Sequence, residues 1–385
     1  MVSAEKCSIQ PPQRFLFGPG PTQVDPRVYE AMNKPIVGHL DPYFFKINEE
    51  LQQMLRVVFG TENKLTFAMS GTGSGGMETA ISNFVESGTK VAVLANGYFC
   101  DRMTEMARRQ GGEVARLEKP WGEVFTDTEA AQFIRSQRPQ VVMYVHAETS
   151  TGACQQGKAI CEAAHAVGAI IIADVVTSLG AMPVNVDETG IDVAYSCTQK
   201  GLSCPPGLAP ITMSPRAAER LNERKTANHS WYFDLKLLND YYNVSHRYHH
   251  TAPISMFYAL HQALSLIMEE GFKNRCERHR RAHLKFVQGI EALGLRMHVE
   301  KAENRIVNLN TPRVPAGVDD AKVRSILFQE HGIEIMGGFG PLAGKVFRVG
   351  VMGPLATDAH VQSFLQHFAD ALQQAGYRHA AGAAR

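Results

Sequence analysis

Residues 65–84 read LTFAMSGTGSGGMETAISNF, a short apolar run, a glycine-rich loop and an amphipathic stretch in direct succession. The run LTFAM (65–69) predicts a buried strand. After the loop 70–76, apolar side chains recur at helical spacing from Met77 to Val85, which predicts a helix that begins at about Met77. A strand joined to a helix by a tight loop is the unit from which α/β folds are built.

The same alternation continues along the chain. Further short apolar runs predict buried strands at 91–96, 141–146, 170–174, 193–197 and 209–213, with amphipathic stretches between them. Strands that alternate with helices form a mostly parallel sheet that is covered on both faces. The predicted fold is therefore α/β, with a large domain built as a three-layer sandwich.

The pattern changes after Glu269. A charged helical stretch covers 271–293, and short apolar runs and two further helices follow it. This order is typical of a smaller α+β domain. We expect an N-terminal arm at 1–20, a large domain at 21–270 and a small C-terminal domain at 271–385.

The composition narrows the class of partner. The 385 residues carry 39 Lys and Arg against 38 Asp and Glu, a formal net charge of +1, so no net field draws the protein to nucleic acid or to an anionic membrane. No segment approaches the ~18 uninterrupted apolar residues of a membrane span. The seven cysteines are scattered without a C-x-x-C pair, which favours a reducing compartment, by default the cytoplasm.

The loop Ser70-Gly-Thr-Gly-Ser-Gly-Gly76 has the features of a phosphate cradle. Glycines let the backbone approach an anion, the following helix supplies free N–H groups at its N-terminus, and Thr72 and Ser74 add hydroxyl donors. No Lys-Ser or Lys-Thr follows, so the loop is not a Walker A motif, and no strand-borne acid marks a dinucleotide fold. The alternative is a tight strand-to-helix turn without a ligand.

Two charged residues follow later strands. Asp174 ends the run IIIAD (170–174), where open α/β sheets bind their ligands, and it is either a partner for a cofactor ring nitrogen or a helix N-cap. Lys200 follows the strand at 193–197 and is either an imine-forming amine or a surface charge. A phosphate loop, an acid and a lysine in this order together match the needs of a pyridoxal cofactor.

At this point the chain resembles the class V aminotransferases, close to the alanine–glyoxylate and serine–glyoxylate enzymes. The resemblance covers nearly the whole chain and is carried by FLFGPGPTQVDPRV (15–28), SGTGSGGMETAISN (70–83), LANGYF (94–99), AETSTG (147–152), ADVVTSLG (173–180), SCTQKGLSCPPG (196–207), RYHHTAPIS (247–255) and EIMGGFGPLAGKVFRVGVMG (334–353). It implies the fold-type I architecture of transferases that depend on pyridoxal 5'-phosphate.

The resemblance also implies roles around the cofactor ring. Lys200 would be the Schiff-base lysine and would move the substrate Cα proton, and Asp174 would pair with the pyridine nitrogen. Thr149 would hydrogen-bond on the side of the phenolic oxygen. Phe99 would stack on the ring where the family often has tryptophan, which gives a smaller stacking area.

For the phosphate and the substrate the resemblance implies further residues. Thr72, Gly73, Ser74 and Gln199 would hold the phosphate, together with Tyr248 and Thr251 from a partner subunit, so a homodimer with shared active sites is expected. Arg348 would bind the substrate carboxylate with its bidentate fork. Gly18 would close the side of the substrate site opposite Arg348, and His39 would lie near the substrate entrance.

The implied reaction moves the amino group of a small amino acid, alanine or serine, to glyoxylate or another small 2-oxo acid. Aspartate or ureidoglycine are alternative donors, because the enzymes of this family differ in which amino acid side chain a small substrate pocket accepts. A pyridoxal-phosphate lyase is a further alternative, although no cysteine follows Cys276 to supply its usual mobile nucleophile. A scaffold without activity has no need of Lys200, Asp174 and Arg348 together.

One formal metal pattern is set aside. Cys276, His279 and His283 have the spacing of one helix face, but four arginines crowd the same stretch. We expect a solvated basic face there and no bound metal.

Overall fold

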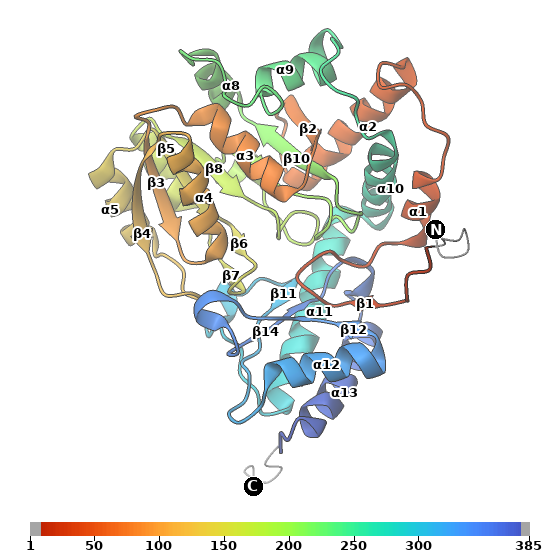
Figure 1. Cartoon of the computed structure of the whole chain (residues 1–385). Coiled ribbons are helices and arrows are strands. Elements are labelled where there is room, and N and C mark those ends of the chain that lie inside the picture. Colours follow the sequence, from red (N-terminus) through yellow and green to blue (C-terminus); the bar gives the residue numbers. More distant parts are fainter. Residues whose placement is uncertain (1–8, 379–385) are drawn as a thin grey trace, which may run out of the picture.

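The computed structural model describes residues 9–378, and a seven-stranded sheet forms the centre of its larger part (Figure 1). The strands lie in the order β2-β10-β9-β8-β5-β3-β4. β10 runs antiparallel to its neighbours β2 and β9, and the other pairings in this sheet are parallel. Their bounds are β2 Leu65–Ser70, β3 Lys90–Ala95, β4 Glu113–Glu118, β5 Val141–Val145, β8 Ile170–Asp174, β9 Val193–Tyr195 and β10 Leu208–Met213.

Helices cover this sheet. Every residue of β5, β8 and β10 is buried, as expected for strands with helices on both faces. The prediction of an α/β fold with a mostly parallel sheet is confirmed. The helices that contact its strands include α2 Pro42–Phe59, α3 Gly73–Phe84, α4 Tyr98–Arg109, α5 Asp127–Gln137 and α6 Lys158–Ala166. The same part of the chain also contains α1 Pro26–Met32, α8 Pro215–Asn222, α9 Leu235–Asn239 and α10 Ile254–Glu270.

Two elements differ from the sequence prediction. α3 begins at Gly73, not at Met77, because its first turn is built from residues whose small side chains leave no apolar periodicity to recognise. β4 (Glu113–Glu118) was missed, because it is an edge strand of sequence EVARLE with no fully buried residue and hence no apolar run.

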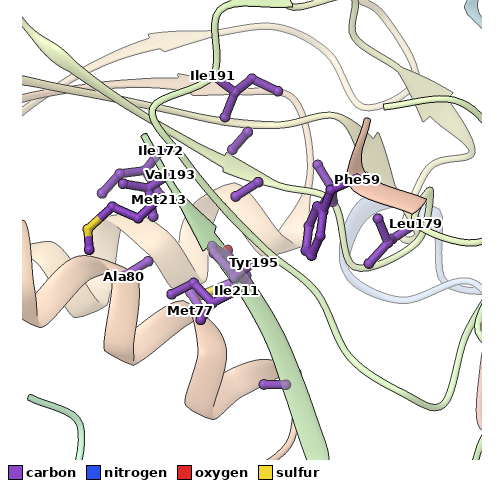
Figure 2. Packing of buried hydrophobic residues seen from close by; sticks show 14 of the residues in the cluster. Phe59, Met77, Ala80, Ile172, Leu179, Ile191, Val193, Tyr195, Ile211 and Met213 are labelled. Atoms are coloured by element: carbon purple, nitrogen blue, oxygen red, sulfur yellow. The ribbon is translucent and has the colours of Figure 1, made fainter. Parts of the chain in front are cut away.

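Close packing holds α3 against the sheet. Figure 2 shows Met77 and Ala80 of α3 near Tyr195, Ile211 and other buried side chains of the strands. A methyl group added at Gly76 would lie only 3.1 Å from the Ala209 Cβ and 3.4 Å from the Ser196 carbonyl oxygen. The missing side chain thus lets the N-terminal turn of α3 lie directly on β9 and β10.

A second hydrophobic cluster lies in the smaller part of the structure, whose helices and strands are drawn below the main sheet in Figure 1. It is built mainly from α11 Phe272–Ala292, α12 Asp320–His331, α13 Asp358–Gln374 and β14 Phe347–Gly350. β14 is the middle strand of a small sheet, between β11 Leu309–Asn310 and β13 Met336–Gly337. Phe17 joins this cluster, and β1 (Phe15–Leu16) pairs with β12 (Ile333–Glu334). The cluster supports a division near residue 271, while the domain limits stay a prediction.

The helix α11 is not the solvated basic face that the sequence suggested. Arg275, His279 and His283 are buried, whereas Arg280 and Arg281 are exposed. Arg275 donates to the carbonyl oxygens of Gly180 at 2.7 Å and Gly201 at 2.8 Å, and burial lowers its pKa to about 10. The prediction was wrong because carbonyl groups from distant loops accept these hydrogen bonds, and local sequence does not reveal them.

Within residues 9–378, no group of three or more His, Cys, Asp or Glu side chains could hold a metal ion. No helix in the same range is long and apolar enough to cross a membrane. His279 and His283 instead bond within the protein: the His279 Nε2 accepts from the Gly353 N–H at 3.0 Å, and the His283 Nδ1 lies 2.7 Å from the Asn310 Oδ1.

The Arg275 contacts predict a large stability effect. Arg275→Ala leaves two buried carbonyl groups without a donor and removes one partner of the Glu270 carboxylate. We expect the free energy of unfolding to fall by about 3–5 kcal/mol, the usual effect of breaking a buried charged network. Denaturant titration measures it. Arg280→Ala on the same helix is the matched control and should leave the unfolding curve unchanged; equal effects would contradict the assignment.

Candidate functional site

Three loops meet at the carboxyl edge of the parallel strands. The glycine-rich loop follows β2, Asp174 ends β8, and Lys200 follows β9. A methyl group added at Gly73 would lie 3.2 Å from the Cys197 Cβ and 3.3 Å from the Val176 Cγ2. The first turn of α3 therefore packs against both the turn after Asp174 and the segment that carries Lys200.

Asp174 is buried, with 3% of its surface exposed. Its Oδ1 accepts from the Val176 N–H and its Oδ2 accepts from the Tyr195 hydroxyl, both at 2.8 Å. Burial raises the pKa of this carboxyl to about 6, and the two hydrogen bonds oppose that shift. The Val176 contact closes a turn and not the helix considered from the sequence, since the next helix is α7 at Val186–Thr189. The Tyr195 contact is long-range and fixes the carboxyl plane.

Lys200 is turned inward. Its Nζ donates to the carbonyl oxygen of Pro19, and a methyl group at Gly20 would lie 2.7 Å from that Nζ. The Thr22 hydroxyl donates to the Lys200 carbonyl oxygen at 3.0 Å. Burial lowers the pKa of Lys200, and the Arg348 charge lowers it further. An exposed surface charge is therefore the wrong description of this lysine.

Polar side chains lie on the glycine-rich loop and on Gln199, and only part of their hydrogen-bonding capacity is used by the described residues. Thr72 is the N-cap of α3, yet its side chain makes no capping hydrogen bond. Ser74 Oγ accepts from the Arg102 Nη1 at 2.9 Å. The Oε1 of Gln199 is buried and has no hydrogen-bond partner among the described residues. Such groups are expected where a polar ligand supplies the missing partner.

A second wall comes from α4 and the segment after β5. Thr149 is buried, and its hydroxyl accepts from the Thr177 hydroxyl at 3.3 Å. Phe99 lies in the first turn of α4, and its N–H donates to the Glu148 Oε2 at 3.0 Å. The Ser150 N–H and hydroxyl donate to the Glu148 Oε1 at 3.0 and 2.6 Å. Glu148 thus fastens the turn that carries Phe99.

Sequence reading missed Glu148, although it stands directly before Thr149. The side chain is fully buried, and burial raises the pKa of its carboxyl to about 7. A possible signal was an acid directly after the apolar run VVMYVHA (141–147), where a charge is costly unless it is paired. In the structure Gly97 leaves room for this carboxylate, because any side chain there would collide with Glu148.

Arg348 lies on β14, across from Lys200. Its Nε donates to the Gly337 carbonyl oxygen at 2.8 Å, and its guanidinium carbon lies 4.3 Å from the Phe339 ring centroid. Burial lowers its pKa to about 10, and the charge of Glu148 opposes that shift. Gly18 lies beside this strand, since the Gly350 N–H donates to the Phe17 carbonyl oxygen at 2.7 Å.

Three predicted residues lie apart from this cluster. The ring of His39 lies 5.0 Å from that of Tyr248, and both Tyr248 and Thr251 are exposed. Among residues 9–378, no hydrogen bond joins the side chains of His39, Tyr248 or Thr251 to the loop 70–76 or to Lys200. Their neighbour His250 does reach the base of the loop, with its Nε2 2.7 Å from the Ser70 hydroxyl.

Comparison with known proteins places the chain among the aminotransferases. Residues 14–349 match the family model of the class V aminotransferases. The (S)-ureidoglycine–glyoxylate transaminase of Bacillus subtilis is 39% identical over 89% of this chain and 86% of its own. The alanine–glyoxylate aminotransferase of Drosophila melanogaster is 37% identical over 96% of this chain and 94% of its own.

A solved structure agrees. The alanine–glyoxylate aminotransferase of Nostoc sp. superposes with a TM-score of 0.93 at 44% identity, covering 97% of this chain and 99% of its own. The fold and the site define an aminotransferase of fold type I. The chain belongs to the class V aminotransferase family.

The Asp174 contacts predict a pH effect on the protein without added cofactor. The carboxyl has a pKa of about 6 in the folded state against 3.8 as its ordinary value. Its contribution to stability is therefore fully present below the ordinary value and is lost as the pH rises through about 6. Tyr195→Phe removes a hydrogen bond to the charged form, so the pKa rises and this loss moves to higher pH.

The measurement is the free energy of unfolding as a function of pH. Tyr144→Phe is the matched control, because the buried Tyr144 hydroxyl has no hydrogen-bond partner within residues 9–378. It should leave the position of the pH step unchanged. A Tyr195→Phe profile that superposes on that of the original protein would contradict the role given to this hydroxyl.

Proposed function

We propose that this protein binds pyridoxal 5'-phosphate and transfers the amino group of a small amino acid, alanine or serine, to glyoxylate or another small 2-oxo acid. The observation that carries the proposal is the meeting of the glycine-rich loop, Asp174 and Lys200 at one sheet edge. The alanine–glyoxylate relatives support the choice of substrates.

The residues present fit this cofactor. The unpartnered Oε1 of Gln199, the free hydroxyl of Thr72 and the N-terminal turn of α3 beginning at Gly73 form a polar cradle for its phosphate, together with Ser74. Asp174 would face the pyridine nitrogen, Thr149 the phenolic oxygen and Phe99 the ring face. When bound, the cofactor supplies the electron sink that stabilises negative charge at the substrate Cα.

The protein supplies binding and proton transfer. Arg348 would hold the substrate carboxylate through its bidentate fork, with Gly18 of the N-terminal arm beside it. Lys200 would take the proton from the substrate Cα and deliver it to C4′ of the cofactor, and the lowered pKa of its amine would help this transfer. Asp174 would keep the ring nitrogen protonated. His39 would lie at the substrate entrance.

Ureidoglycine is the main alternative donor, because the Bacillus subtilis relative that acts on it is 39% identical to this chain. Aspartate is a weaker alternative, and a lyase reaction weaker still. The donors share the carboxylate that Arg348 would bind and differ in the side chain. The choice between them therefore rests on a small pocket around the substrate Cβ.

The proposal predicts a spectral change that depends on the donor. Protein loaded with pyridoxal 5'-phosphate should absorb visible light, and L-alanine or L-serine without an acceptor should bleach that band. Glyoxylate should then restore it. Lys200→Ala should lose turnover by several orders of magnitude while keeping the fold, because the proton acceptor is gone. A protein that stays colourless with added cofactor, or a Lys200→Ala variant with full turnover, would refute the assignment.

A homodimer with shared sites is part of the proposal. Exposed large apolar side chains gather on two segments that meet at the His39–Tyr248 contact. Apolar patches of this kind mark protein interfaces. They are Tyr29, Ile36, Leu40 and Tyr43 on the first segment and Trp231, Tyr232, Leu237, Val244 and Tyr248 on the second. Burial of these segments against a second copy would let Tyr248 and Thr251 reach the partner's phosphate.

Mixed dimers test this arrangement. A Lys200→Ala chain is combined with a Tyr248→Phe chain, and cofactor affinity is measured at the remaining Lys200. If Tyr248 acts on the partner's site, that lysine has an intact tyrosine beside it and keeps full affinity. If Tyr248 acts on its own chain's site, affinity falls about 10-fold, as in the Tyr248→Phe homodimer. An active monomer in sedimentation would contradict the shared site altogether.

The cysteines bear on the cellular compartment that we propose. The six cysteines among residues 9–378 form no disulfide. Together with their scattered positions, this supports a reducing compartment such as the cytoplasm. The near-neutral charge supports small molecules as the partners, with no role for nucleic acid.

A further inference from the structure

Arg102 occupies a position that the sequence analysis did not consider. It lies on α4, one turn after Phe99, and its Nη1 donates to the Ser74 hydroxyl at 2.9 Å. Its guanidinium carbon lies 4.9 Å from the Phe99 ring centroid and 5.3 Å from that of Tyr98. Arg102 therefore touches the glycine-rich loop and the ring-stacking residue at the same time.

The guanidinium has no acidic partner. No carboxylate lies within 4.0 Å of Arg102 in residues 9–378, whereas Arg109 on the same helix pairs with Glu105 at 2.8 Å. A guanidinium has five N–H donors, and the Ser74 hydroxyl takes up one of them. An unpaired, half-buried cation of this kind is expected where an anion binds.

The cradle also lacks charge of its own. Thr72, Gly73, Ser74 and Gln199 are uncharged, and the N-terminus of α3 supplies only about half a positive charge. A phosphate monoester carries a charge between about −1.5 and −2 near neutral pH. Arg102 is the charged side chain that hydrogen-bonds to this loop, so it can balance the phosphate where the neutral donors cannot.

We propose that Arg102 binds the phosphate group of the cofactor, as the charged member of the cradle that Ser74 and the N-terminus of α3 begin. Its flat face would remain on Phe99, so the phosphate and the ring would be held by one side chain. The proposal rests on the function proposed above, and it goes beyond the residues that the resemblance assigns.

The test compares two forms of the cofactor. Holoenzyme is prepared with pyridoxal 5'-phosphate or with pyridoxal, which lacks the phosphate, and each dissociation constant is measured by equilibrium dialysis. Arg102→Gln should weaken binding of the phosphorylated form about 10- to 100-fold, as expected for lost charge-assisted hydrogen bonds. Binding of pyridoxal should change less than about threefold, because only the weak contact with Phe99 is lost.

Two variants serve as controls. Arg109→Gln removes an exposed, paired arginine from the same helix and should leave both constants unchanged. Arg102→Lys keeps the charge without the planar fork and should show an intermediate loss for the phosphorylated form. Thermal unfolding of each variant separates a folding defect from a binding defect.

A second measurement uses inorganic phosphate as competitor. It should weaken cofactor binding to the original protein and have a smaller effect on Arg102→Gln, since the variant has lost part of the anion site. Equal losses for pyridoxal and its phosphate would overturn the proposal and leave Arg102 as a support for Phe99. No loss for either form would overturn it as well. Failure of the original protein to bind the cofactor would instead refute the proposed function.

Discussion

The close approach of α3 to β9 and β10 sets the geometry of the candidate site. It depends on the missing side chains of Gly73 and Gly76, where an added methyl group would lie 3.1 to 3.2 Å from neighbouring Cβ atoms. Because the helix begins so near the strands, its free N–H groups open between the turn after Asp174 and the segment of Lys200. The phosphate end and the ring end of the proposed ligand are thereby fixed relative to one another by backbone packing alone.

Burial acts in opposite directions on the charged groups of this site. It raises the pKa of Asp174 and Glu148 and lowers that of Lys200 and Arg348, since each charged form loses contact with water. Each group therefore needs partners. Asp174 has the Tyr195 hydroxyl, and Glu148 has the Ser150 and Phe99 N–H groups. These contacts make the wall around the ring rigid, which suits a site that must hold a flat cofactor in one orientation.

The sequence predicted what depends on local pattern. Apolar runs correctly predicted six strands of the main sheet. The glycine-rich loop, Asp174 and Lys200 were predicted to lie at one edge of the sheet, and they do so because parallel strands end there together. Contacts between distant segments left no such pattern. Arg275 looked like surface charge because its acceptors are carbonyl groups of Gly180 and Gly201. Arg102 was overlooked for the same reason, because its hydrogen bond is to Ser74, far along the chain. Glu148 did leave a local signal, an acid directly after an apolar run, which the sequence analysis did not use. Tyr248 and Thr251 were assigned by resemblance, and their proposed contacts lie on a second copy.

The N-terminal arm links the two halves of the proposed chemistry. The Phe17 carbonyl oxygen accepts from Gly350 on β14, two residues after Arg348, and the Pro19 carbonyl oxygen accepts from the Lys200 amine. Only Gly18 separates Phe17 from Pro19, so the distance between their two carbonyl groups is nearly constant. The arm therefore fixes the spacing between Lys200 and Arg348. That spacing matters for the proposed reaction, because the carboxylate that Arg348 would hold is one bond from the Cα whose proton Lys200 would move. A small error in either position would misplace the proton relative to its acceptor, and rates of such transfers fall steeply with misplacement. The arm contributes Phe17 to the small core and a carbonyl group to the lysine, and it is therefore part of the active site that we propose.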